Sequence, residues 1–101
     1  MPLVKIKDIE PGMENIEVVG RVTDISGKRR VSTRYGLADV AVAVLKDETG
    51  SIHLNLWRQQ IDSVSDGKVV RIINAFARVY NDRLELNIGQ SGQIVAVEGN
   101  E

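Results

Sequence analysis

The sequence predicts an all-β domain of five strands, with one short helix between the third and fourth strands. Apolar residues recur at every second position over most of the chain, which is the period of a half-buried strand. Residues 58–66 depart from this pattern, with two apolar side chains three positions apart, as in a short helix. At 101 residues the chain is long enough for one hydrophobic core and too short for two. We therefore expect residues 1–101 to form a single domain.

The first strand is predicted over roughly residues 14–25, and Gly20 permits a sharp bend in it. Its inward face carries Ile16, Val18, Gly20 and Val22. After the predicted loop GKRRVSTRYG, the second strand runs from about Leu37 to Lys46, with alternating valines on one face and Ala41 and Ala43 on the other. The turn after this strand ends at Gly50, which we expect to supply a positive φ.

The third strand, SIHLNLW, alternates most clearly, with Ile52, Leu54 and Leu56 on the core face. The fourth strand is predicted from Lys68 to about Asn81. Its alternation assigns Ile73, Ala75, Ala77 and Val79 to the core, and Asn74, Phe76, Arg78 and Tyr80 to the outer face. In the fifth strand Leu84, Leu86 and Ile88 face inward, and residues 93–97 are expected to extend that edge.

Five strands in this order, with a helix between the third and fourth, are typical of a five-stranded OB-fold barrel. Such a barrel binds oligonucleotides on the face of its second and third strands and with its first and fourth loops. A small barrel of SH3 type is the alternative that remains open. The core in either case is aliphatic.

Charge is distributed unevenly along a chain whose net charge is −1. Residues 21–34 carry five basic side chains and one acidic side chain, residues 68–83 carry four basic and one acidic, and the remaining segments are acidic. Two basic patches on a negative body are consistent with phosphate contacts at a defined site. The chain has no cysteine, which excludes disulfides and thiolate metal sites and indicates a reducing, cytoplasmic setting.

Three of the four aromatic side chains are predicted to lie on outward faces of strands: Trp57, Phe76 and Tyr80. An exposed row of aromatic residues is costly in water unless a partner covers it. In an OB fold unpaired bases are that partner, because every base offers a π face for stacking. Two alternatives stay open: a register slip by one residue would bury Phe76, and Trp57 could be a packing lid over the barrel mouth.

Basic side chains near these aromatics are candidate phosphate contacts, and Arg78 between Phe76 and Tyr80 could also stack on a base. The candidates for the phosphate chain or the groove wall are Lys28, Arg29, Arg30, Arg34, Arg78 and Arg83. Weaker candidates, chosen by their place on the same faces or in the first loop, are Tyr35, His53, Asn55, Asn74 and Asn87.

The segments DETGSIHLNLW, DGKVVRIINAF and RLELNIG resemble the archaeal single-stranded-DNA-binding proteins and the OB domains of replication protein A. They are also similar to the human sensor-of-ssDNA subunits. The resemblance runs from about Ile6 to Ile94, and it implies that Trp57, Phe76 and Tyr80 stack on bases. Some members of the family have a further aromatic residue where this chain has Asn87, which would remove one stacking platform.

We therefore expect a protein that binds single-stranded DNA without strong sequence preference, in replication, recombination or repair. A protein-binding OB subunit of a replication protein A-like complex and a single-stranded RNA binder are the alternatives. No enzyme is expected, since the chain has one histidine and no nucleophile elbow, P-loop or zinc-protease motif. The sequence predicts no cofactor, metal site or membrane segment. It favours a monomeric, cytoplasmic, nucleoid-associated domain, with other replication or repair proteins as further candidate partners.

Overall fold

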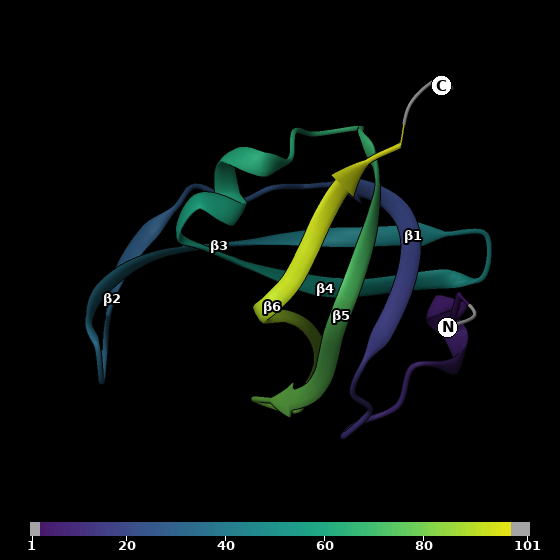
Figure 1. The fold of residues 1–101 in the computed structure, drawn as a ribbon, viewed down its shortest axis with the longest axis horizontal. Coiled ribbons are helices and arrows are strands. Elements are labelled where there is room, and N and C mark those ends of the chain that lie inside the picture. The colour runs from purple at the N-terminus through teal and green to yellow at the C-terminus, as the bar shows by residue number, and fades with distance from the viewer. Residues whose placement is uncertain (1–2, 98–101) are drawn as a thin grey trace.

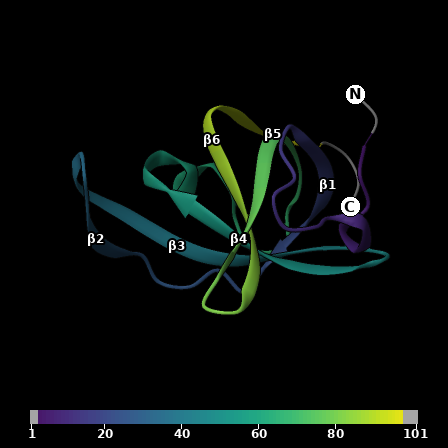
Figure 2. The ribbon, with the colours of Figure 1, turned by 90° about the horizontal axis from the view of Figure 1, so that it is seen from below.

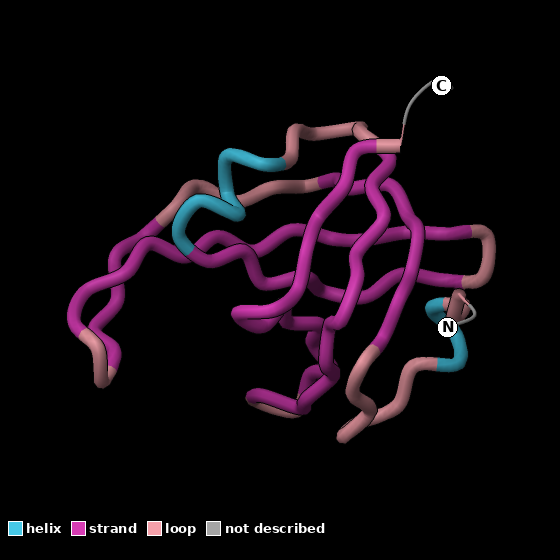
Figure 3. Tube along the Cα trace, in the orientation of Figure 1, coloured by secondary structure: helices cyan, strands magenta, loops and turns pink. Residues whose placement is uncertain are grey.

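The computed structural model describes residues 3–97, which are mostly strands (Figure 1 and Figure 3). Two short 3₁₀ helices accompany six strands. In chain order the elements are η1 (Ile6–Asp8), β1 (Ile16–Thr23), β2 (Arg29–Thr33), β3 (Gly36–Asp47), β4 (Gly50–Trp57), η2 (Arg58–Ser63), β5 (Val69–Tyr80) and β6 (Arg83–Ala96). No helix in the described range is long and apolar enough to cross a membrane.

Five of the strands form a hydrogen-bonded ring in the order β1, β5, β6, β4, β3. The ring closes because β1 pairs antiparallel with β5 along most of its length and with β3 at its end. β4 and β6 pair in parallel. The helix expected between the third and fourth predicted strands is present as η2, between β4 and β5. The five predicted strands and the helix between the third and fourth thus occur along the chain in the predicted order, as β1, β3, β4, η2, β5 and β6.

The core inside this ring is aliphatic, as predicted. Leu54 and Leu56 of β4, Leu86 of β6 and Leu45 of β3 are all fully buried. Alternation along each strand brings these side chains to the inner face and leaves the other face to solvent. The aromatic residues are thus not needed to fill the core.

Gly20 in β1 lies where two strands approach closely. A Cβ at this position would stand 2.7 Å from the carbonyl oxygen of Lys46 and 2.9 Å from the side chain of Leu45. Glycine is therefore required here for space, because β1 turns at this point from pairing with β5 to pairing with β3.

β5 changes its inward face at Asn74. Val70 and Ile72 are buried before this residue, whereas Ala75 and Ala77 are buried after it. Asn74 has φ 61°, and the register with β6 shifts between Ile73 and Ala75. These features mark a β-bulge, which inserts one extra residue and reverses the alternation that follows.

The bulge corrects the predicted core face of the fourth strand. Ile73 is only half-buried, because the inward positions upstream of the bulge are the even-numbered ones. Val79 was also assigned to the core, but it is 50% exposed, since it is the second-last residue of β5 and pairs with Leu84 next to the β5–β6 turn. Ala75 and Ala77 do face inward, so the alternative register that would bury Phe76 in the core is not adopted.

Residues 27–36 were predicted as a loop, but they contain the sixth strand, β2. β2 pairs antiparallel with the first part of β3, from Arg29 opposite Val40 to Thr33 opposite Gly36. Gly36 has φ 110° in the turn, and Thr33 Oγ1 donates to its carbonyl oxygen. The resulting hairpin projects from the ring as an arm in both ribbon views (Figure 1 and Figure 2). Val31 lies opposite Ala38 in this pairing, and it is half-buried.

The turn between β3 and β4 is organised by Asp47. Its Oδ1 accepts hydrogen bonds from the backbone nitrogens of Thr49 (2.7 Å) and Gly50 (3.2 Å), and its Oδ2 accepts one from the nitrogen of Ile6 (2.9 Å). The positive φ predicted for Gly50 is wrong, since the carboxylate closes this turn without left-handed backbone at that residue. Asp47 thereby ties η1 to the ring.

Candidate functional site

A groove with a volume of about 560 Å³ lies on the outer face of the sheet, opposite the core. Its lining side chains come from β2 to β6 and from the β5–β6 turn. They are Arg29, Val31, Val40, Val42, Asn55, Trp57, Phe76, Arg78, Tyr80, Asn81, Arg83, Glu85 and Asn87. Residues that lie far apart in the sequence thus share one surface.

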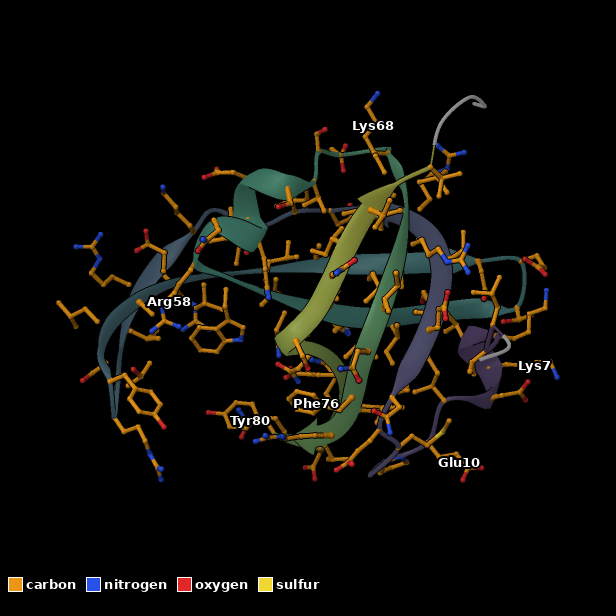
Figure 4. The ribbon with its side chains drawn as sticks, in the orientation of Figure 1. Lys7, Glu10, Arg58, Lys68, Phe76 and Tyr80 are labelled. Atoms are coloured by element: carbon orange, nitrogen blue, oxygen red, sulfur yellow. The ribbon has the colours of Figure 1, made fainter. Side chains whose placement is uncertain are left out.

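Three aromatic side chains meet in this groove, as the sequence predicts. Trp57 comes from the last residue of β4, and Phe76 and Tyr80 come from the end of β5, where Figure 4 labels them. Trp57 and Phe76 are half-buried, whereas Tyr80 is 63% exposed. Phe76 and Tyr80 are four residues apart in a strand, so their side chains leave the same face. Their rings offer flat apolar surfaces to a ligand.

Trp57 is held at its backbone by the short helix that follows it. The Oε1 atom of Gln60 accepts a hydrogen bond from Trp57 N (2.9 Å), and Gln60 Nε2 donates to the carbonyl oxygen of Ile88 (3.3 Å). Gln60 therefore links η2 to β4 and β6. The helix supports the edge of the groove rather than entering it.

Three arginines line the groove with the aromatic residues. The Arg78 guanidinium lies 5.4 Å from the centroid of the Phe76 ring, within the range of a cation–π interaction. Arg83, at the start of β6, donates to Glu85 Oε2 at 3.0 Å. Arg29 reaches the groove from β2. These cations come from three different strands.

The other predicted basic candidates are not in the groove lining. Arg30 Nε donates to Asp39 Oδ1 at 3.1 Å, and Lys28 Nζ lies 4.0 Å from the same carboxylate. Arg34 is at the tip of the β2–β3 arm, with its guanidinium 6.0 Å from the ring centroid of Tyr35. Tyr35 is 82% exposed and is also outside the lining. Pairing of β2 with β3 separates these side chains from Arg29.

Two of the weaker candidates lie in the groove and two others do not. Asn55 and Asn87 line it, as neighbours on β4 and β6. His53 is half-buried on β4 beyond the lining. Asn74 forms the bulge of β5, where its side chain donates to Ser91 Oγ (2.8 Å).

Sequence reasoning missed part of the groove surface, including Val31, Val40, Val42 and Glu85. The signal for the two β3 valines was present, because they alternate with the buried Ala41 and form an apolar outer face. Glu85 is 5% exposed, although it lies on the outer face of β6 between inward leucines. Its burial depends on neighbouring strands, so the sequence carried no sign of it.

This surface is suited to a polymer that carries planar aromatic rings and is linked by phosphate groups. Aromatic faces stack on planar rings, and guanidinium groups bind phosphates or stack beside the rings. Within residues 3–97 no group of three His, Cys, Asp or Glu side chains is placed to hold a metal ion.

Comparison with known proteins gives a family match over most of the chain. Residues 9–96 match the family model described as "Single-stranded DNA binding protein Ssb-like, OB fold". The chain is 33% identical over 90 residues to the single-stranded DNA binding protein Ssb of Saccharolobus solfataricus, covering 89% of this chain and 61% of that protein. It is also 33% identical over 96 residues to replication factor A of Methanothermobacter thermautotrophicus, covering 94% of this chain and 12% of the relative. The chain thus spans less than two thirds of either relative.

Solved structures confirm the predicted OB fold. The OB domain of a Thermoplasma acidophilum protein superposes with a TM-score of 0.85 at 30% identity, covering 98% of this chain and 90% of that domain. A replication factor A related protein from Methanobacterium thermoautotrophicum superposes with a TM-score of 0.80 at 26% identity, covering 96% of this chain and 92% of the other.

Proposed function

The chain belongs to the Ssb-like family of single-stranded DNA binding proteins with an OB fold, and we propose that it binds single-stranded DNA in the groove described above. The resemblance to archaeal single-stranded-DNA-binding proteins and to replication factor A is confirmed by the relatives of both kinds. Binding by this chain, the contacts that it uses and its tolerance of sequence are the proposal.

The observation that carries the proposal is the convergence of Trp57, Phe76 and Tyr80 on one groove. Stacking of a base on an aromatic side chain contributes on the order of 1–3 kcal/mol and does not depend strongly on which base is stacked. Three platforms on two strands would accept a short run of bases. Such a site favours single strands, because bases in a duplex are already stacked on one another.

Arg29, Arg78 and Arg83 would supply the contacts to the phosphate chain. Each neutralised phosphate of a single strand contributes about −0.7 to the slope of log affinity against log salt. Three contacts therefore give a slope near −2 by this estimate. We expect a footprint of about 4–6 nucleotides, near the low end for OB folds.

The groove also favours nucleic acid over a protein partner. Three arginines from three strands beside the aromatic platforms match a phosphate chain that runs beside stacked bases. We extend the proposal to a role wherever DNA is unwound inside the cell, in replication, recombination or repair, with no catalysis by this domain.

The test is a titration of tryptophan fluorescence, which reports on Trp57 alone because the chain has one tryptophan. The protein would be titrated with oligo(dT), oligo(U) and duplex DNA at low and moderate salt. Quenching by oligo(dT) but not by duplex supports the proposal, and an equal response to oligo(U) would widen it to single-stranded nucleic acid. Absence of binding to any of the three would overturn it in favour of a protein-binding subunit.

A matched pair of variants separates the groove from the rest of the surface. Tyr80→Ala removes an exposed aromatic side chain inside the groove, and Tyr35→Ala removes one outside it. Neither tyrosine is part of the core, so both variants should fold. Loss of oligo(dT) affinity in Tyr80→Ala but not in Tyr35→Ala is the expected result.

A further inference from the structure

A nearly buried carboxylate is part of the lining of the groove that is proposed to bind a polyanion. Glu85 is 5% exposed, and its two oxygens have different partners. Oε2 accepts hydrogen bonds from Arg83 Nε (3.3 Å) and Nη2 (3.0 Å), and Oε1 accepts one from Asn55 Nδ2 (2.8 Å). The arginine offsets the charge of the carboxylate, so Glu85 is not an unpaired anion facing phosphates.

Glu85 determines how the amide of Asn55 is oriented. A carboxylate can only accept hydrogen bonds, so the nitrogen of Asn55, and not its oxygen, must face Glu85. The same nitrogen also donates to Asn87 Oδ1 at 3.1 Å. Both N–H groups of the Asn55 side chain therefore donate hydrogen bonds within the protein.

Asn55 in turn determines how the side-chain amide of Asn87 is oriented. Since Asn87 Oδ1 faces the donor of Asn55, the nitrogen of Asn87 is turned away from it. Among the described residues, neither Asn55 Oδ1 nor Asn87 Nδ2 has a hydrogen-bond partner. The groove floor thus offers one acceptor and one donor in a fixed arrangement.

These two amides lie next to the proposed stacking platforms. Asn87 is directly opposite Phe76 in the pairing of β5 with β6, and Asn55 is two residues before Trp57 on the same face of β4. A base stacked on either ring would bring its edge toward the floor. Each of the four bases has a hydrogen-bond donor beside an acceptor on its Watson–Crick edge, and single strands leave this edge free.

Building on the proposed function, we propose that Asn55 Oδ1 and Asn87 Nδ2 bind the Watson–Crick edge of a stacked base, and that Glu85 is the positioning residue that orients both amides. The site then recognises a free base edge in addition to a free base face. Because every base has a donor beside an acceptor on this edge, the contact is not restricted to one base, and it rejects duplex, whose edges are already paired.

The test compares oligo(dT) with the same oligonucleotide carrying N3-methylthymine at every position. The methyl group removes the N3–H donor and leaves the ring face and the phosphates in place. The wild-type domain should bind the methylated strand about three- to tenfold more weakly, the effect of losing one hydrogen bond. Asn55→Ala should bind both strands equally, and His53→Ala, on the same strand outside the groove lining, should keep the wild-type ratio.

Glu85→Gln tests the positioning role. A glutamine amide can donate as well as accept, so it no longer forces the Asn55 nitrogen toward it, and the ratio between the two strands should fall toward one. Thermal unfolding checks that the variant folds, and Asn55→Ala carries the test if it does not.

Two results would overturn the inference and leave single-strand binding intact. One is equal binding of both strands by the wild-type domain. The other is a penalty of the same size in wild type and in Asn55→Ala, which would come from the bulk of the methyl group. Failure to bind either strand would overturn the proposed function itself, and this inference with it.

Discussion

Arg78 and Phe76 leave the same face of β5, with the guanidinium 5.4 Å from the centroid of the aromatic ring. The pair faces the groove because Asn74 inserts a bulge before it. This bulge brings Ala75 and Ala77 to the core, so Phe76 and Arg78 lie on the outer face. A cation and a stacking platform are thereby placed together in the groove. A base on Phe76 and the phosphate next to it could be bound at the same time.

Removing a stacking platform should weaken binding much more than folding. Trp57→Ala and Phe76→Ala should each cost on the order of 1–3 kcal/mol of oligo(dT) binding, because each removes one base–aromatic contact. Both side chains are only half-buried, so the free energy of unfolding should change little. Binding is measured by anisotropy of a labelled oligonucleotide, since Trp57→Ala has no tryptophan fluorescence. A variant that unfolds instead would show that its aromatic residue belongs to the core.

Arg78→Ala should change the salt dependence of binding. Loss of one phosphate contact should make the negative slope of log affinity against log salt shallower by about 0.7. Arg71→Ala is the matched control, because Arg71 also lies on β5 but is paired with Glu17 and is outside the groove lining. Slopes are measured over a series of salt concentrations. Equal slopes for Arg78→Ala and wild type would mean that Arg78 does not contact phosphate.

Gly20→Ala should destabilise the fold. The added methyl group would overlap the Lys46 carbonyl and the Leu45 side chain, and overpacking of this kind costs about 1–3 kcal/mol. Gly27→Ala is the control, since a Cβ there has no atom within 4 Å. Denaturant unfolding gives both free energies. A Gly20→Ala domain as stable as Gly27→Ala would show that β1 can move away from β3 at little cost.

Acid should weaken the attachment of η1 through Asp47. Burial acts to raise the pKa of Asp47, but hydrogen bonds from Thr49 and from the backbone of Ile6 and Gly50 outweigh it and bring the pKa below its ordinary value of 3.8. A folded-state pKa below the unfolded one gives stability that is present above about pH 4 and is lost as the pH falls through the folded pKa.

Asp47→Asn should therefore be less stable than wild type near neutral pH and should lose less stability between about pH 4 and pH 2. The measurement is the free energy of unfolding across this range. Asp62→Asn serves as the control, because Asp62 is an exposed carboxylate on η2. Parallel acid curves for wild type and Asp47→Asn would contradict the assigned role of Asp47.

Much of the fold followed from local sequence pattern. Alternation in SIHLNLW placed Leu54 and Leu56 in the core and Trp57 on the outer face, and the structure agrees. Side-chain direction along a regular strand depends only on position in that strand, so a period of two is readable without knowledge of neighbours.

The pattern failed where a partner strand changes the local outcome. The fourth strand reverses its inward face at Asn74, and a bulge of this kind depends on the register with β6. The segment RRVST became strand β2 because β3 offered it a free edge for pairing. Neither event is recorded in the alternation of apolar residues.

The sequence by itself determined an all-β domain with an aliphatic core and an outward Trp57, because these follow from the order of residues along each strand. The outward direction predicted for Phe76 and Tyr80 is also observed, but it depends on the bulge at Asn74. Only the tertiary structure decided which cations join them, selecting Arg29 over Arg30, since adjacent residues of a strand point to opposite faces. It also placed Asn55 against Glu85, 30 residues apart. That contact exists because closure of the ring aligns β4 with β6, and no local rule relates two strands that are distant in the chain.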